Sequence, residues 1–207
     1  MADIDVSELR SAIDGPVLVP GDPGYDAEVS GWEILVTHHP DVVVGATSQR
    51  DVAAAVRFAR DRGLRVFVQA TGHGTYTPIT SGVMVTTRRL DGVEIDPEVR
   101  VATIDAGVQW QAVIDAAAPH GLMPVTGSST IVGAVGYLLG GGLGPVSRSH
   151  GFSSDYLRSL TVVTSDGEVV EASAESNPDL FWALRGGKAG FGIVTQVRLA
   201  LVPAPSL

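Results

Sequence analysis

The residues best suited to chemistry in this chain are a histidine flanked by glycines and the glycines themselves. Glycine makes up 25 of the 207 residues, roughly 12% against a typical ~7%. The glycines gather at 72–74, 127–144, 151–167 and 186–192. Because glycine lets the backbone come close to a ligand or to another strand, this clustering predicts either a ligand site or tight turns. Within the first cluster, His73 is either a nucleophilic imidazole or a structural loop histidine.

Two common phosphate-binding patterns do not fit the glycine clusters. A Walker A motif that ends at Gly187–Lys188 needs glycine where Trp182 stands and Ser or Thr where Ala189 stands. A Rossmann fingerprint that starts at Gly140 needs glycine at the position of Pro145. The sequence therefore supports neither nucleoside triphosphate hydrolysis nor a Rossmann dinucleotide site.

Charge and composition narrow the class of protein further. The formal net charge is −9, with 14 Lys and Arg and no cysteine. No basic run is present, so we expect neither nucleic-acid nor membrane binding. The start of the chain has no basic and apolar leader, and no apolar stretch reaches the ~18 residues of a membrane span. These absences favour a cytoplasmic protein without disulfides.

Other residues that could carry chemistry lack the necessary patterns. His38, His39, His120 and His150 show no metal-ligand spacing with carboxylates such as His-Glu-x-x-His. The serines at 128–129 lack the Gly-x-Ser-x-Gly frame of a hydrolase nucleophile. We therefore expect no metal site and no serine hydrolase.

The clearest structural pattern is a βαβ unit in the first half of the chain. Residues 42–44 predict a buried strand, and Ser48 with Asp51 has the spacing of a capping box at a helix start. Gly63 predicts the end of that helix, and 64–68 predicts the next strand.

The second half alternates further strands with helices. Asp166–Gly167 is a hairpin signal between two strands, and Asn177–Pro178 predicts a helix cap. Further elements are expected at 83–87, 99–104, 160–164, 168–171 and 193–201 as strands, and at 110–117 and 180–184 as helices. The pattern indicates an α+β fold with two lobes: a capping segment at 1–40, a first βαβ lobe at 41–96 and a larger mixed lobe at 97–203.

Several motifs stand together in the order of one family. They occupy 20–25, 44–51, 71–74, 136–144, 177–186 and 190–195. Over about residues 18–203 the chain resembles the FAD-binding, PCMH-type domain of berberine-bridge-enzyme-like oxidases, within the wider vanillyl-alcohol oxidase and cytokinin dehydrogenase group. The resemblance implies a two-lobed α+β domain that holds an extended FAD.

The resemblance also implies which residues hold the flavin. His73 is expected to bond to the 8α-methyl carbon of the flavin ring, and the backbone beside it to cradle the diphosphate. The expected cofactor-binding residues are Gln69, Ala70, Thr71, Gly72, His73, Gly74, Thr75, Gly127, Ser128, Ser129, Val132, Gly133, Gly136, Tyr137, Gly140, Gly141, Gly142, Gly144, Asp155, Tyr156, Ile193 and Val194.

The sequence departs from the family pattern at a few of these positions. Ser129 stands where some members carry the cysteine of a second flavin bond, so a bicovalent flavin is excluded. Tyr137 stands where some relatives carry histidine. Gln69 and Thr71 replace frequent arginine and glycine, and Gly190 replaces a common asparagine.

The family's chemistry is hydride transfer from an alcohol, a sugar or a C–H next to nitrogen to the flavin, which dioxygen then reoxidises. Two alternatives stay open: an oxygen-independent dehydrogenase or reductase on the same fold, and a non-catalytic flavin-binding module. The resemblance places the catalytic base and the contacts to a small-molecule substrate in a further domain. We expect a linker to that absent domain to begin at 204–207, and the chain to be a fragment rather than a naturally short protein.

Overall fold

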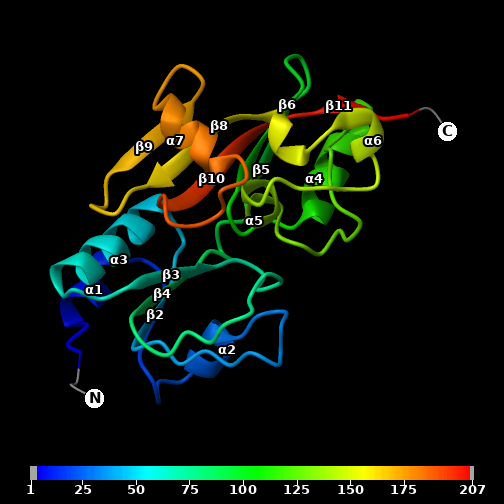
Figure 1. The fold of residues 1–207 in the computed structure, drawn as a ribbon. Helices are drawn as coiled ribbons and strands as arrows, with labels where there is room; N and C mark the ends of the chain where they lie inside the picture. Colours follow the sequence, from blue (N-terminus) through cyan, green and yellow to red (C-terminus); the bar gives the residue numbers. More distant parts are fainter. Residues whose placement is uncertain (1–3, 206–207) are drawn as a thin grey trace. The chain divides into compact units, whose positions relative to one another are not determined.

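The computed structural model describes residues 4–205, and its contacts divide them into two compact units. Unit 1 comprises the chain up to Leu90 together with Val163–Val169 (Figure 1). Unit 2 comprises Asp91–Val162 and the chain from Val170 onward. The first three residues of the predicted capping segment and the last two of the predicted linker lie outside the described part. None of the described helices has the length and apolar character needed to cross a membrane.

Unit 1 is built on a four-stranded sheet in the order β1-β2-β4-β3. The central strands β2, β4 and β3 run parallel, and β1 pairs antiparallel with β2. All residues of β2 and β4 are buried, as expected for parallel strands covered on both faces. The strands are β1 Val17–Leu18, β2 Val42–Gly45, β3 Val66–Gln69 and β4 Val83–Thr86, and the helices are α1 Ser7–Ala12, α2 Tyr25–Val29 and α3 Gln49–Asp61.

Helix α3 connects β2 to β3 and confirms the predicted βαβ unit. The Ser48 hydroxyl accepts a hydrogen bond from the Asp51 amide at 3.2 Å, which is the predicted cap. The Asp51 carboxylate in turn accepts a hydrogen bond from the Thr47 amide at 2.9 Å. Just beyond the helix, Gly63 adopts a φ of 64°, a left-handed conformation that favours glycine.

Unit 2 contains a five-stranded sheet in the order β5-β6-β10-β8-β9 and a small pair of β11 with β7. Strand β6 pairs antiparallel with both β5 and β10. The core between the sheet and the helices includes Trp110 and Leu138, both fully buried. The strands are β5 Val93–Asp96, β6 Val101–Asp105, β7 Leu122–Met123, β8 Leu157–Val163, β9 Val169–Ser173, β10 Ile193–Ala200 and β11 Val202–Pro203. The helices are α4 Trp110–Ala117, α5 Ala134–Leu139, α6 Ser147–His150 and α7 Pro178–Leu184, with 3-10 turns η1 Ala118–His120 and η2 Ser153–Tyr156.

The predicted hairpin and the predicted helix cap in unit 2 can both be compared with the structure. The hairpin signal at Asp166–Gly167 is confirmed, because it joins the neighbouring strands β8 and β9. Asn177 is the N-cap residue of α7, as predicted, but its side chain makes no capping hydrogen bond. Asn177 has a φ of 50°. Its side-chain Nδ2 donates a hydrogen bond to the Glu171 carbonyl at 2.7 Å. Pro178 is the first helical residue, as expected.

Candidate functional site

His73 lies in the loop after β3, and its imidazole ring is held on two sides in unit 1. The ring stacks on Trp32, with ring centroids 4.7 Å apart and planes 9° apart. Its Nδ1 is 2.8 Å from the Thr71 hydroxyl oxygen. Its Nε2 is buried and makes no hydrogen bond to any described residue. Burial holds the pKa of His73 below its ordinary value, so the neutral form of the imidazole is favoured.

The loop that carries His73 packs tightly against the segment that carries Trp32. The Trp32 amide donates to the Thr71 carbonyl at 2.8 Å. Gly72 has a φ of 79°, and a Cβ there would lie 2.8 Å from the Gly31 Cα and 3.0 Å from the Trp32 nitrogen. Packing of the protein against itself therefore requires glycine at position 72, whether or not a ligand also approaches.

The Gln69 side chain connects the end of α2 to the loop that carries His73. Its side chain is buried, and Nε2 donates to the carbonyls of Val29 and Ser30, each at 3.3 Å. The Thr75 hydroxyl donates to Oε1 at 3.4 Å. The Gln69 amide is thus committed to the protein, and only backbone atoms of this residue remain to contact a cofactor.

A buried ion pair fixes the end of α2, just before Trp32. Both oxygens of Glu28 accept from Arg89, at 2.8 and 2.7 Å, and one also accepts from the Thr86 hydroxyl. Burial alone would raise the pKa of Glu28, but the hydrogen bonds from Arg89 and Thr86 outweigh it and leave that pKa lowered. The pair therefore ties α2 to the residues that follow β4.

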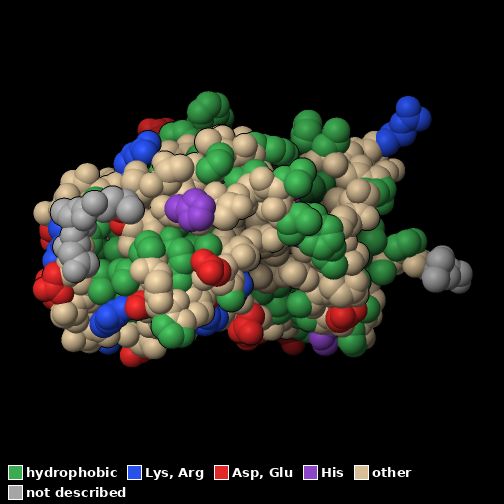
Figure 2. Space-filling view, turned by 90° about the horizontal axis from the view of Figure 1, so that it is seen from below, with side chains coloured by type: hydrophobic (Ala, Val, Ile, Leu, Met, Phe, Trp, Pro, Cys, Tyr) green, Lys and Arg blue, Asp and Glu red, His purple; other side chains and the backbone are tan. Residues whose placement is uncertain are grey.

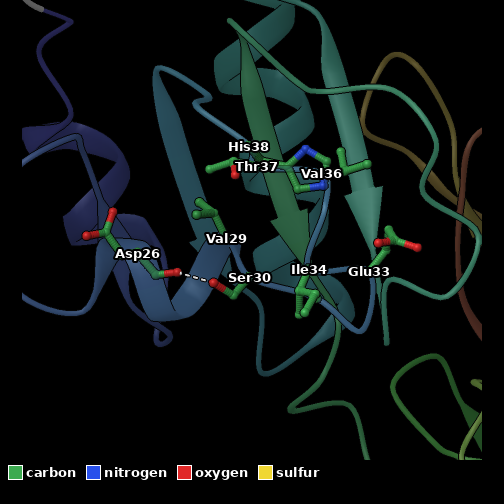
Figure 3. A pocket seen from close by; sticks show the side chains of 9 residues that line it. Asp26, Val29, Ser30, Glu33, Ile34, Val36, Thr37 and His38 are labelled. Carbon is green, nitrogen blue, oxygen red and sulfur yellow. Dashed lines mark hydrogen bonds between the residues drawn. The ribbon is translucent and has the colours of Figure 1, made fainter.

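Unit 1 also contains a small hollow beside this region (Figure 3). Its volume is about 200 Å³, below the ~300–1,000 Å³ of typical small-molecule pockets. Figure 3 shows the Ser30 hydroxyl directed at the Asp26 carbonyl, with a hydrogen bond of 2.6 Å. The hollow is lined by Asp26, Val29, Ser30, Gly31, Glu33, Ile34, Val36, Thr37 and His38. None of the predicted cofactor-binding residues lines it.

Apolar side chains nevertheless remain on the surface of unit 1 next to the histidine loop. Trp32 is 59% exposed, and Ile34 and Leu35 follow it with still greater exposure. Tyr76, three residues after His73, is also largely exposed. Figure 2 shows hydrophobic side chains dispersed over the face in view, among acidic and basic side chains. A group of exposed apolar side chains of this kind can mark a ligand-binding surface.

In unit 2, the glycine-rich segment 127–144 folds around Tyr137. A Cβ at Gly127 would lie 2.9 Å from the Tyr137 ring, and one at Gly142 would meet both that ring and Ser153 at under 3 Å. A Cβ at Gly144 would overlap the Thr126 carbonyl. Close packing with the protein accounts for these three glycines.

Other glycines of the same segment face open space. A Cβ at Gly136 or Gly141 would meet nothing within 4 Å. Nearby, the hydroxyls of Thr126, Tyr137 and Ser153 are buried without a well-formed hydrogen bond to a described residue. Burial raises the pKa of the Tyr137 phenol, while Ser153 acts in the opposite direction. Open backbone beside buried hydroxyls that lack a well-formed hydrogen bond fits a ligand that offers both donors and acceptors, as FAD does.

Other predicted residues of unit 2 differ in burial and in their contacts. Asp155 is exposed and accepts from the Phe152 amide at 3.1 Å and from Arg185 at 3.3 Å. The Tyr156 hydroxyl is 3.3 Å from His150 Nδ1. The side chains of Ile193 and Val194 are buried in β10, so only their backbone could contact a cofactor. Ser128 is exposed, and Ser129 and Val132 are half-buried.

The sequence did not reveal Trp32 or Ser153 as part of these sites. Trp32 lies in a weakly periodic segment with no motif, and Ser153 is one serine among several. The one available signal was Gly31 before Trp32, since a glycine beside an aromatic residue can mark a close backbone approach.

Comparisons with known proteins agree with this geometry. A family profile described as a FAD binding domain matches residues 40–173. (R)-6-hydroxynicotine oxidase of Paenarthrobacter nicotinovorans is 35% identical over 196 residues, which cover 94% of this chain and 43% of that protein. A carbohydrate oxidase structure from Microdochium nivale superposes with a TM-score of 0.87 at 29% identity, covering 95% of this chain and 43% of the other.

A third structural neighbour is an oxidase whose FAD is described as cysteinyl and histidyl. Glucooligosaccharide oxidase from Acremonium strictum, studied for its 6-S-cysteinyl, 8α-N1-histidyl FAD, has a TM-score of 0.85 at 30% identity, covering 95% of this chain and 42% of the other. The fold and the site thus define a FAD-binding domain. This chain belongs to the FAD-binding domain family of the berberine-bridge-enzyme-like and vanillyl-alcohol oxidase group. It spans less than half the length of the relatives named here.

Proposed function

We propose that this chain holds FAD through a covalent bond to His73 and serves an oxidase of alcohols, sugars or C–H bonds next to nitrogen. The observation that carries the proposal is the His73 imidazole in the loop after β3, which stacks on Trp32 and whose neutral form is favoured by burial. The histidyl flavin of a structural neighbour supports the same chemistry.

The protein's own residues prepare the imidazole for this bond. Burial lowers the pKa of His73, so the ring keeps the lone pair that a nucleophile needs near neutral pH. The stacked Trp32 restricts rotation of the ring and leaves its own outer face exposed. When bound, the flavin would accept a hydride from the substrate. A thioether to the flavin cannot come from this chain, because it contains no cysteine.

Acid precipitation tests the covalent bond. The protein is expressed with FAD supplied, precipitated in acid, and the washed pellet is examined for flavin absorbance and for a flavin-bearing peptide that contains His73. We expect a yellow pellet from the wild type and a colourless one from His73→Gln that still binds FAD reversibly. A colourless wild-type pellet would refute the covalent bond.

Reoxidation tests the oxidase assignment separately. The reduced flavoprotein is mixed with dioxygen in a stopped-flow instrument, and the return of oxidised flavin absorbance is followed. We expect reoxidation by dioxygen to exceed that of free reduced flavin. Slow reaction with dioxygen but rapid reaction with a dye acceptor would make the protein a dehydrogenase.

A further inference from the structure

One face of the His73 imidazole is covered by an aromatic side chain that is itself largely exposed. The ring centroids of Trp32 and His73 are 4.7 Å apart, and the ring planes are 9° apart. Trp32 nevertheless keeps 59% of its surface exposed. Burial in a hydrophobic core therefore does not explain why the indole lies against the imidazole.

Backbone contacts on both sides hold Trp32 in this position. Arg88 donates hydrogen bonds to the carbonyls of Glu28 at 3.0 Å and Ser30 at 2.8 Å, which fixes the end of α2 and the residues after it. The Trp32 amide donates to the Thr71 carbonyl at 2.8 Å. The backbone thus presents the indole to the histidine loop.

We propose that Trp32 is a positioning residue for His73 and that the face of its indole stabilises positive charge on the imidazole. This inference rests on the covalent attachment proposed above and adds a residue that lies outside the glycine-rich motifs. Indole is the aromatic ring whose face attracts a cation most strongly, at distances up to about 6 Å from the ring centroid. The separation of 4.7 Å lies within that range.

Attachment of the flavin is the step in which this charge develops. One C–H bond of the 8α-methyl group and one N–H bond of the imidazole break, and one C–N bond forms. The two electrons and two protons released reduce dioxygen to hydrogen peroxide. Between formation of the C–N bond and loss of the N–H proton, the imidazole is positively charged. A group that stabilises this cation without taking the proton lowers the barrier to attachment.

The carboxylates closest to Trp32 along the chain have other partners. Glu28 is bound by Arg89 through both of its oxygens. Glu33 accepts a hydrogen bond at 2.9 Å from the backbone amide two residues later. Burial lowers the pKa of His73, and no charged side chain in the described part of the chain acts on that pKa. The indole face is therefore the group placed to offset a positive charge on the ring.

The pKa of His73 in the FAD-free protein tests the electrostatic role without any flavin chemistry. Trp32→Phe and Trp32→Leu introduce side chains of similar size, but only Phe keeps an aromatic face. NMR titration of isotope-labelled histidine gives the pKa in each variant, and His73→Gln assigns the signal. We expect the pKa to be lower by roughly 0.3–0.5 pH unit in Trp32→Leu than in Trp32→Phe, as for the loss of a cation–π contact at an exposed site. Equal values in the two variants would overturn the electrostatic role.

The rate of flavin attachment tests the consequence for the proposed function. Acid-stable flavin should form about two- to fivefold more slowly in Trp32→Leu than in the wild type, and Trp32→Phe should recover most of the rate. The Kd for FAD, measured in the His73→Gln background, should stay within about twofold. Trp182→Leu is the matched control, because Trp182 is also exposed, at 79%, but lies in unit 2, and it should change neither quantity.

The outcomes separate this inference from the proposed attachment. A wild-type rate of attachment in Trp32→Leu would overturn the positioning role and leave the covalent bond intact. A wild-type protein without acid-stable flavin would refute the attachment, whereas the pKa comparison would still test the stack. The wild type also needs no variant for one check: the indole ring current should shift the His73 ring protons upfield of those of the other histidines. Unshifted His73 protons would refute the stack even if Trp32→Leu does not fold.

Discussion

Replacing Gly136 with alanine separates a ligand-facing glycine from one that the protein's own packing requires. Gly136 lies within α5, is exposed, and a Cβ there would meet nothing within 4 Å. Alanine is favoured over glycine inside a helix by about 0.5–1 kcal/mol. Without FAD, Gly136→Ala should therefore be more stable than the wild type by about that amount.

The same methyl group should oppose FAD binding. If the cofactor lies against the Gly136 backbone, the Cβ takes space that the cofactor needs, and overpacking of this kind costs typically ~1–3 kcal/mol. Since about 1.4 kcal/mol is a tenfold change in affinity, the Kd for FAD should rise about tenfold or more. Stability and affinity then change in opposite directions, which a simple packing defect cannot produce.

The two quantities are measured in separate assays. Urea denaturation of the FAD-free protein, followed by circular dichroism, gives the free energy of unfolding. Flavin fluorescence quenching gives the Kd for FAD in the His73→Gln background, where covalent attachment cannot mask the equilibrium. Gly144→Ala is the control, because its Cβ would overlap the Thr126 carbonyl and should destabilise the protein itself. If Gly136→Ala binds FAD with unchanged affinity, the cofactor does not lie against this backbone.

Three further predictions concern unit 1. Glu28→Gln should lower the free energy of unfolding by about 2 kcal/mol, which is less than the loss of a fully buried ion pair costs, because Arg89 is 35% exposed. The pKa of Glu28 is lowered in the folded protein. The difference in free energy of unfolding between wild type and variant, measured by urea denaturation, should therefore be complete above pH ~4.3 and shrink as the pH falls below it. Tyr25→Phe leaves the buried Pro40 carbonyl without its 2.6 Å hydrogen bond and should cost about 1–2 kcal/mol by urea denaturation; a cost below ~0.5 kcal/mol would contradict the assignment. Burial lowers the pKa of His73, so the rate of acid-stable flavin formation should rise with pH and reach half its maximum below pH ~6.5; a midpoint above that value would contradict a buried neutral imidazole.

The parts of the fold that the sequence predicted are those where local pattern and burial agree. The run of valines in β2 is buried on both faces, and the Ser48 cap satisfies the first turn of α3 by a local bond. Helix α5 was not predicted, because its glycine has low helix propensity and the helix depends on tertiary contacts of Ala134 and Leu138. The left-handed Asn177 was missed for the same reason: its amide bonds to Glu171, six residues earlier, rather than to its own helix.

The candidate site shows a different limit of sequence reasoning. The sequence shows that a position is glycine, but it does not show which atoms occupy the space that a side chain would fill. Gly136 and Gly144 therefore cannot be distinguished from the sequence. Only the surrounding atoms separate them, since Gly144 faces the Thr126 carbonyl and Gly136 faces open space. Trp32 was missed because its partner His73 is 41 residues away, and no spacing rule links a stacked pair at that distance.

In unit 2, the glycines that pack against the protein hold in place the backbone that carries the glycines facing open space. Gly127 and Gly142 leave room for the Tyr137 ring, which could not be buried at this place if either carried a side chain. The Ser153 and Ser154 amides bond to the carbonyls of Gly142 and Gly141, each at 2.9 Å, and so fix the backbone at the open position Gly141. A glycine lost from the packed group should therefore impair cofactor binding indirectly, by moving Tyr137 and the open backbone together. For this reason loss of FAD binding alone does not identify a contact residue, whereas loss of binding with gained stability does.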